Sequence, residues 1–186
     1  MKVLAISGSL RRDSFNTKVL LAARELVDGE VDLEVYGGLK EIPPYDEEDD
    51  VEPAPAAVAQ LRDAIAGADA ILFSTPEYNS SIPGQLKNAL DWASRPIATN
   101  VLRNKAVAVV GASTGAFGAV WAQAELRKVL AALGARVFDI ELPVPHAHTR
   151  FDETGLTDEE IRAGLEDAIQ TLLAEIRLRE EAMAAA

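Results

Sequence analysis

The sequence predicts an α/β fold in which helices cover both faces of a five-stranded, doubly wound parallel sheet. Short apolar segments rich in branched residues alternate with longer segments whose apolar residues recur at helical spacing, and this alternation occurs five times. Parallel strands joined by helices require right-handed crossovers, and in a doubly wound sheet the reversal of winding places helices on both faces. The length of 186 residues suits one domain of about 150 residues, so residues 1–186 are expected to form a single domain.

The first half of the chain predicts three strands and two helices. They are a strand at 3–6, a helix at 15–27, a strand at 31–36, a helix from residue 56 and a strand at 70–73. Ser14 is placed to cap the first helix, and Asp28-Gly29 to end it. Apolar and polar residues alternate over the second strand, which therefore has one wetter face and is expected near an edge of the sheet.

The second half of the chain predicts two strands and three helices. They are a helix at 83–94, a strand at 105–110, a helix at 116–133, a strand at 136–142 and a helix at 158–183. Pro83 suits the first turn of a helix, where no backbone donor is needed. Gly134 suits a helix end, because glycine adopts left-handed backbone conformations.

Residues 43–55 contain four prolines and the acidic run Asp46 to Asp50. Proline at this density continues neither a helix nor a central strand, so a long exposed loop is expected. A solvated loop is favoured over a metal site for the acidic run, because it lacks the glycine-centred spacing of a calcium loop.

Composition excludes several kinds of chemistry. The chain is 48% hydrophobic and 26% charged, and it has no cysteine. A core is therefore expected, while disulfides, thiolate metal sites and a thiol nucleophile are excluded. Redox chemistry in such a chain must come from a cofactor.

The charge balance and the hydropathy pattern limit the partners. Eighteen basic against 30 acidic residues give a net charge of −12, which disfavours nucleic acid and anionic membranes. No segment approaches the roughly 18 apolar residues of a membrane span, and the N-terminal apolar run is too short for a signal peptide. We expect a cytoplasmic protein that binds neither nucleic acid nor membrane.

Ligands of doubly wound sheets bind at the carboxyl ends of the strands, which directs attention to the loops at 7–16, 75–82 and 111–118. The first of these loops leads into a helix and carries hydroxyls, free amides and two arginines, which are groups that bind phosphate. Its spacing is neither a dinucleotide fingerprint nor a P-loop, so a monophosphate fits better. An ordinary capped turn is the alternative.

The other two loops offer a surface for a flat ligand. Tyr78 in the second loop could cover a planar heterocycle while nearby backbone amides contact its heteroatoms. A plain turn is the alternative interpretation for this loop. Three glycines in the third loop would let the backbone approach a ligand closely.

Two motifs resemble the NADPH-dependent FMN reductase family of flavodoxin-like proteins, which includes quinone, chromate and azo-dye reductases. They are G-S-L-R-x-x-S-F-N at residues 8–16 and P-E-Y-N-x-S-I-P-G-x-L-K-N-A-x-D-W at residues 76–92. The resemblance runs from Met1 to about His146. It implies three groups of FMN-binding residues and no catalytic or metal-binding side chain. By this resemblance the phosphate is held by Ser9, Arg11, Ser14 and Asn16, the isoalloxazine and ribityl part contacts Pro76, Glu77, Tyr78 and Asn79, and the ring is bordered by Ser113, Thr114 and Gly115.

The resemblance implies an enzyme that passes hydride from NADPH or NADH to FMN and then two electrons to a small-molecule acceptor such as a quinone, an azo compound or chromate. A reductase that supplies free reduced flavin to a partner stays open as an alternative. So does a non-enzymatic flavodoxin-like electron carrier, although such carriers hold phosphate without arginine and stack flavin between two aromatics. Here the first loop contains Arg11, and the second contains one aromatic, Tyr78.

The resemblance also implies a homodimer or homotetramer. The apolar face of the helix at 83–94 is the candidate contact, and packing of that face on the sheet is the alternative. Trp92 and Trp121 are expected in the core or at an interface. His146 and His148 are expected to be incidental rather than metal ligands, because no carboxylate motif accompanies them.

Overall fold

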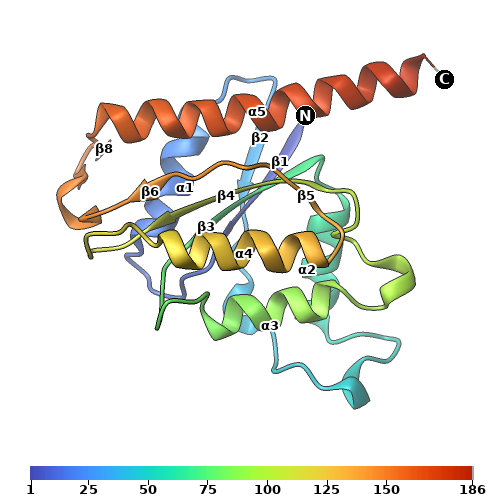
Figure 1. The fold of residues 1–186 in the computed structure, drawn as a ribbon. Coiled ribbons are helices and arrows are strands. Elements are labelled where there is room, and N and C mark those ends of the chain that lie inside the picture. Colours follow the sequence, from blue (N-terminus) through green and yellow to red (C-terminus); the bar gives the residue numbers. More distant parts are fainter. Residues whose placement is uncertain (186) are drawn as a thin grey trace.

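The computed structural model describes residues 1–185 and arranges them in three layers, with a parallel sheet between two layers of helices (Figure 1). The strands of the sheet are β1 (Lys2–Ser7), β2 (Asp32–Val35), β3 (Ala70–Thr75), β4 (Ala106–Ala112), β5 (Arg136–Val137) and β6 (Pro143–Val144). The helices are α1 (Phe15–Glu25), α2 (Ala56–Ala66), α3 (Gly84–Ala93), α4 (Val120–Ala132) and α5 (Glu159–Ala184). The predicted α/β class with a five-stranded parallel core is confirmed.

The sheet is doubly wound about β1. The strand order is β2-β1-β3-β4-β5, and β6 pairs with β4 beyond the end of β5. The chain moves from β1 outward to β2, then returns to the other side of β1 for β3, so the winding reverses between β1 and β3. Ligands of such sheets bind outside the carboxyl ends of the strands at this reversal.

The central strands are buried on both faces, and their side chains alternate between two hydrophobic clusters. Val3 and Ala5 face the cluster under α1 and α5, whereas Leu4 and Ile6 face the cluster under α2, α3 and α4. Continuous apolar runs are typical of parallel strands covered on both faces. The predicted edge position of the second strand is also confirmed, because within residues 1–185 β2 pairs with β1 alone.

The predicted fifth strand at 136–142 is wrong in its middle. Within this run and the two residues after it, only β5 and β6 are strands paired with β4, and no backbone N–H of residues 139–141 bonds to β4 within residues 1–185. The backbone N–H of Leu142 donates instead to the Gln123 side chain (3.3 Å). The next residue, Pro143, has no N–H to donate. One apolar run therefore becomes two short strands.

The predicted start of the fourth helix at residue 116 is also wrong, because α4 begins at Val120. Gly118 (φ +58°) and Ala119 (φ +64°) take left-handed conformations, which cannot continue into a right-handed helix. The preceding strand, β4, extends through Gly111 to Ala112, past its predicted end at residue 110. Residues 113–119 thus form a longer loop than the sequence pattern indicates.

Gly118→Ala is expected to destabilise the protein, whereas Gly115→Ala is not. A Cβ on Gly118 would lie 2.7 Å from both the Pro143 side chain and the Val144 backbone nitrogen, at a positive φ. The left-handed backbone and the clash together should cost at least about 2 kcal/mol. A Cβ on Gly115 meets only the Ser113 hydroxyl at 3.5 Å. Urea unfolding of both variants checks this, and equal stabilities would contradict it.

The acidic segment at 43–55 is more structured than the long exposed loop that was predicted. It follows the 3₁₀ turn η1 (Leu39–Glu41) and contains a second one, η2 (Glu47–Asp49). The Tyr45 ring packs edge-on against Trp92, with centroids 4.9 Å apart. Asp50 pairs with Arg62 at 2.9 Å, and their side chains are only 16% and 12% exposed. The segment is therefore anchored at both ends of the acidic run.

The C-terminal part adds a small hairpin that the sequence did not predict, β7 (Phe151–Asp152) with β8 (Gly155–Leu156). Asp158 then caps α5, its carboxylate accepting from the Ile161 amide at 3.1 Å. That hydrogen bond lowers the pKa of Asp158, with a smaller contribution from Arg150. No helix among residues 1–185 is long and apolar enough to cross a membrane.

Candidate functional site

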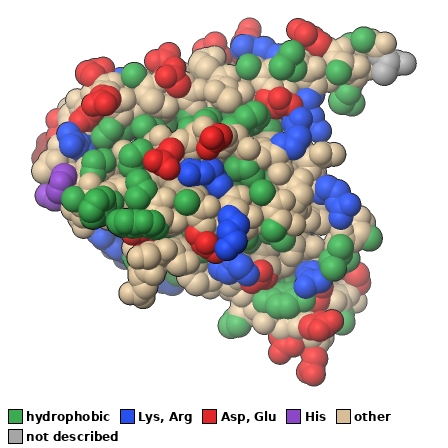
Figure 2. All heavy atoms as spheres, viewed as in Figure 1, with side chains coloured by type: hydrophobic (Ala, Val, Ile, Leu, Met, Phe, Trp, Pro, Cys, Tyr) green, Lys and Arg blue, Asp and Glu red, His purple; other side chains and the backbone are tan. Residues whose placement is uncertain are grey.

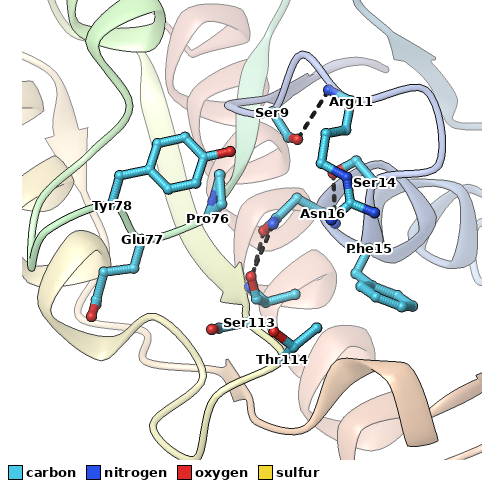
Figure 3. Close-up of a pocket in the computed structure, with 11 residues that line it drawn as sticks. Ser9, Arg11, Ser14, Phe15, Asn16, Pro76, Glu77, Tyr78, Ser113 and Thr114 are labelled. Atoms are coloured by element: carbon cyan, nitrogen blue, oxygen red, sulfur yellow. Dashed lines mark hydrogen bonds between the residues drawn. The ribbon is translucent and has the colours of Figure 1, made fainter.

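The three loops at the carboxyl ends of β1, β3 and β4 line one pocket (Figure 3). Its walls are Ser9, Arg11, Ser14, Phe15, Asn16, Pro76, Glu77, Tyr78, Ala112, Ser113 and Thr114. Nine of the predicted site residues are thus brought together, and Asn79 and Gly115 are not among the lining residues. Phe15 and Ala112 also line the pocket and were not among the predicted site residues. Both lie within the loops at 7–16 and 111–118, and this position is the signal that could have indicated them.

The first loop is built to receive an anion. Within residues 1–185, the backbone N–H groups of residues 12–15 find no acceptor, and the Arg11 guanidinium forms neither a hydrogen bond nor an ion pair. Ser14 caps α1, because its hydroxyl oxygen accepts a hydrogen bond from the backbone N–H of Asn16 at 3.2 Å. Unpaired amides at a helix N-terminus beside a guanidinium suit a phosphate group.

Asn16 is buried and joins α1 to two strands. Its Oδ1 accepts from the Ala112 N–H (2.9 Å) and from the Ser74 hydroxyl (2.9 Å), and its Nδ2 donates to the Ala112 carbonyl (3.0 Å). The side-chain oxygen of Asn16 thus accepts two hydrogen bonds, and its side-chain nitrogen donates one and keeps a second hydrogen available. Asn16 therefore holds the first loop against the ends of β3 and β4, whatever contact it also makes with a ligand.

A tight turn at residues 78–81 positions Tyr78. Tyr78 and Ser81 exchange backbone hydrogen bonds of 3.0 and 3.1 Å around Asn79 (φ +53°) and Ser80 (φ +61°). Two left-handed central residues are the signature of a type I′ turn, in which asparagine is common. Asn79 lies at the exposed tip of this turn, and Tyr78 is half-exposed at the mouth of the pocket.

Glu77 lies in the pocket wall, but its carboxylate points away from the first loop (Figure 3). Its Oε2 accepts from the backbone N–H groups of Trp121 and Ala122, each at 3.0 Å. These two amides belong to the first turn of α4. The second loop is therefore tied to the helix that follows the third loop.

The third loop contributes Ser113 and Thr114 to the pocket and directs Gly115 elsewhere. The Gly115 N–H donates to the Ser113 hydroxyl (3.1 Å), and its carbonyl accepts from the His146 N–H (3.0 Å). The imidazoles of His146 and His148 are exposed, with ring centroids 6.3 Å apart. Within residues 1–185, no cluster of three or more histidine, aspartate or glutamate side chains is placed to hold a metal ion.

Two exposed aromatic residues lie near the pocket. The rings of Phe117 and Trp121 are in edge contact at 4.9 Å and are 62% and 48% exposed. Figure 2 shows hydrophobic side chains gathered at this end of the molecule, beside the histidines. Trp92, in contrast, is completely buried.

The candidate oligomer contact on the helix at 83–94 is not available on the surface. Its apolar residues are Leu86, Ala89, Leu90, Trp92 and Ala93, and all are buried in the cluster beneath α2, α3 and α4. The structure thus supports the alternative, packing of this face inside the chain.

The donor set suits a phosphorylated flat cofactor. An anion would meet the free amides and the guanidinium of the first loop, while a planar ring would meet Tyr78 and the backbone of the second and third loops. Such a pocket binds, orients and shields a cofactor that itself supplies the chemistry.

Comparison with known proteins agrees with this arrangement. A family model described as NADPH-dependent FMN reductase matches residues 1–149. An NAD(P)H-dependent FMN reductase of Pseudomonas aeruginosa is 41% identical over 174 residues, covering 92% of this chain and 93% of the relative. A 2-hydroxy-1,4-benzoquinone reductase of a Burkholderia species is 39% identical over 183 residues, covering 96% and 98%. The solved structure of FerB, an NAD(P)H:(acceptor) oxidoreductase of Paracoccus denitrificans, superposes with a TM-score of 0.83 at 33% identity, covering 95% and 97%.

Proposed function

The chain belongs to the NADPH-dependent FMN reductase family, and from this premise we propose which residues hold the cofactor and what the reduced cofactor acts on. The expected class, an NAD(P)H-dependent FMN oxidoreductase of flavodoxin-like fold, is confirmed by the family model and by relatives of that class. We further propose that residues 1–186 act as one FMN-binding domain.

FMN phosphate binds, in this proposal, at the first loop, on Ser9, Arg11, Ser14, Asn16 and the free backbone N–H groups of Ser14 and Phe15. The isoalloxazine and ribityl part lies along the second loop, on Pro76, Glu77, Tyr78 and Asn79, and the ring is bordered by Ser113, Thr114 and Gly115. The observation that carries this proposal is that Arg11, Ser14 and Phe15 lie in the wall of a three-loop pocket, where the Arg11 guanidinium and the Ser14 and Phe15 backbone N–H groups have no partner within residues 1–185. Asn79 and Gly115 do not line the pocket themselves, but each directly follows a residue that does.

When bound, FMN would supply the chemistry for moving a hydride from NADPH or NADH and two electrons to an acceptor. The protein's own contribution is binding and orientation. The first loop fixes the phosphate end, the turn at residues 78–81 sets the position of the Tyr78 ring, and Asn16 holds the first loop to the strands. No side chain is required as a nucleophile.

A quinone is the acceptor class that we propose, because relatives that cover most of the chain are named as quinone reductases. Azo compounds and chromate are further acceptors of the proposed kind. We also propose a cytoplasmic homodimer or homotetramer. An enzyme that releases reduced flavin to a partner is distinguished by the experiment below.

We expect ping-pong kinetics, with NAD(P)H and the quinone reacting in turn at one pocket. A chain of 186 residues that forms one domain leaves little room for a second substrate domain, so both substrates are expected to reach the same face of the flavin. Initial rates measured with FMN-loaded protein, NADPH and benzoquinone should give parallel double-reciprocal lines. Converging lines, which indicate a ternary complex, would contradict a shared approach. Quinone reduction that requires continuous addition of free FMN would instead support release of reduced flavin.

A further inference from the structure

The N-terminus of α4 has no cap of its own. Its N-cap residue is Ala119, which has a left-handed backbone (φ +64°) and no side chain able to accept a hydrogen bond. The first N–H groups of a helix need acceptors from outside the helix. Glu77, which precedes these residues by 44 and 45 positions, provides one oxygen for both Trp121 N–H and Ala122 N–H, at 3.0 Å each.

The Glu77 carboxylate and the helix end also match in charge. A helix N-terminus carries roughly half a positive charge, and a carboxylate there is stabilised. Within residues 1–185, Glu77 forms no ion pair with a lysine or arginine. The end of α4 is therefore the positive partner that the structure offers to this carboxylate.

These contacts are the side-chain link between the second loop and α4. No other side-chain hydrogen bond joins residues 76–81 to that helix within residues 1–185. On the other side, buried Gln123 donates to the Gly118 carbonyl (3.1 Å) and accepts from the Leu142 N–H (3.3 Å). The first turn of α4 is thus hydrogen-bonded to the third loop through Gln123, and Glu77 joins the second loop to the same turn.

We propose that Glu77 is a positioning residue that locks the second loop to the N-terminus of α4 and neutralises the positive end of that helix beside the pocket. The inference rests on the proposed function, because it takes the pocket as the FMN site. Its consequence concerns the potential of the bound cofactor. Reduction adds electrons to the flavin, so a helix end left without its carboxylate would stabilise the reduced form and raise the midpoint potential.

Three variants of the full-length protein test this inference: Glu77→Gln, Glu77→Ala and the control Glu125→Gln. Glu125 also lies on α4, beyond the first turn, with a side chain that is 38% exposed and 3.5 Å from the Lys128 ammonium. The Glu125→Gln substitution removes the same charge as Glu77→Gln, at a position away from the helix end. FMN affinity, the midpoint potential of the bound FMN and thermal unfolding of the FMN-free protein are measured for each.

Glu77→Gln retains an oxygen that can accept both amides, so FMN affinity should stay within about three-fold while the midpoint potential rises. Glu77→Ala removes both hydrogen bonds as well as the charge, and FMN affinity should fall by about ten-fold or more. Glu125→Gln should leave both quantities at the wild-type values. The glutamine variant keeps the test informative if the alanine variant does not fold.

A midpoint potential of Glu77→Gln equal to that of wild type, or shifted equally in Glu125→Gln, would overturn the charge-balancing role. Wild-type FMN affinity in folded Glu77→Ala would overturn the positioning role. Both outcomes require that the wild-type protein binds FMN. Failure of the wild type to bind FMN would reject the proposed function itself, and the two failures are thereby distinguished.

Discussion

Arg11→Ala is expected to weaken FMN binding by about ten- to a hundred-fold. A chain of net charge −12 repels an anion at long range, so affinity for the phosphate depends on short-range donors. The Arg11 guanidinium lines the pocket and has no partner within residues 1–185. A hydrogen bond to a charged group contributes roughly 1.5 to 3 kcal/mol, and each 1.4 kcal/mol corresponds to ten-fold in affinity.

Comparison of FMN with riboflavin isolates the phosphate contribution. Riboflavin lacks the phosphate, so its affinity should change far less in Arg11→Ala. Arg12→Ala is the matched control, because Arg12 is exposed beside Arg11 and does not line the pocket. Fluorescence titration of both flavins against the three proteins measures these affinities. Equal losses for FMN and riboflavin, or no loss for either, would show that the phosphate binds elsewhere.

Asn16→Ala is expected to lower the free energy of unfolding by about 3 to 5 kcal/mol. The substitution removes three buried hydrogen bonds and leaves the N–H and carbonyl of Ala112 and the Ser74 hydroxyl without their partner. Each buried polar group left unsatisfied costs about 1 to 3 kcal/mol. The same substitution frees the first loop from the strands, so FMN affinity should fall as well.

Urea unfolding of FMN-free protein checks the effect of Asn16→Ala. Arg24→Ala serves as the control, since it makes the same kind of truncation on an exposed position of α1. Asn16→Asp keeps an acceptor for the Ala112 N–H but places a second oxygen against the Ala112 carbonyl, so it should also destabilise the protein. If Asn16→Ala unfolds at the same urea concentration as Arg24→Ala, the hydrogen bonds of Asn16 contribute little to stability.

Local sequence patterns were sufficient for most of the fold. The apolar run at 70–73, the capping serine at 14 and the alternation at 31–36 predicted β3, the start of α1 and the edge strand β2, and the structure confirms all three. These signals work because backbone periodicity and capping act over a few residues. The position of the pocket followed from topology, since ligands of doubly wound sheets bind at the carboxyl ends of the strands.

Nine of the eleven residues predicted for the site from the sequence line one pocket. The two exceptions, Asn79 and Gly115, are turn residues adjacent to residues that do line it. A turn sends neighbouring residues in different directions, so membership of a motif does not decide which of its side chains face the pocket.

Only the tertiary structure decided the features that depend on distant partners. Left-handed Gly118 and Ala119 delay α4 to Val120, and the carboxylate that caps it comes from Glu77 on another loop. The amide of Asn16 bonds a backbone 96 residues away. Such contacts leave no period in the sequence, because a single hydrogen bond depends on where two segments meet after folding. The sequence by itself therefore determined the class of the fold, the edge at which the ligand loops gather and the residue types they carry, whereas packing decided which of these side chains remain free for a ligand and which hold the loops in place.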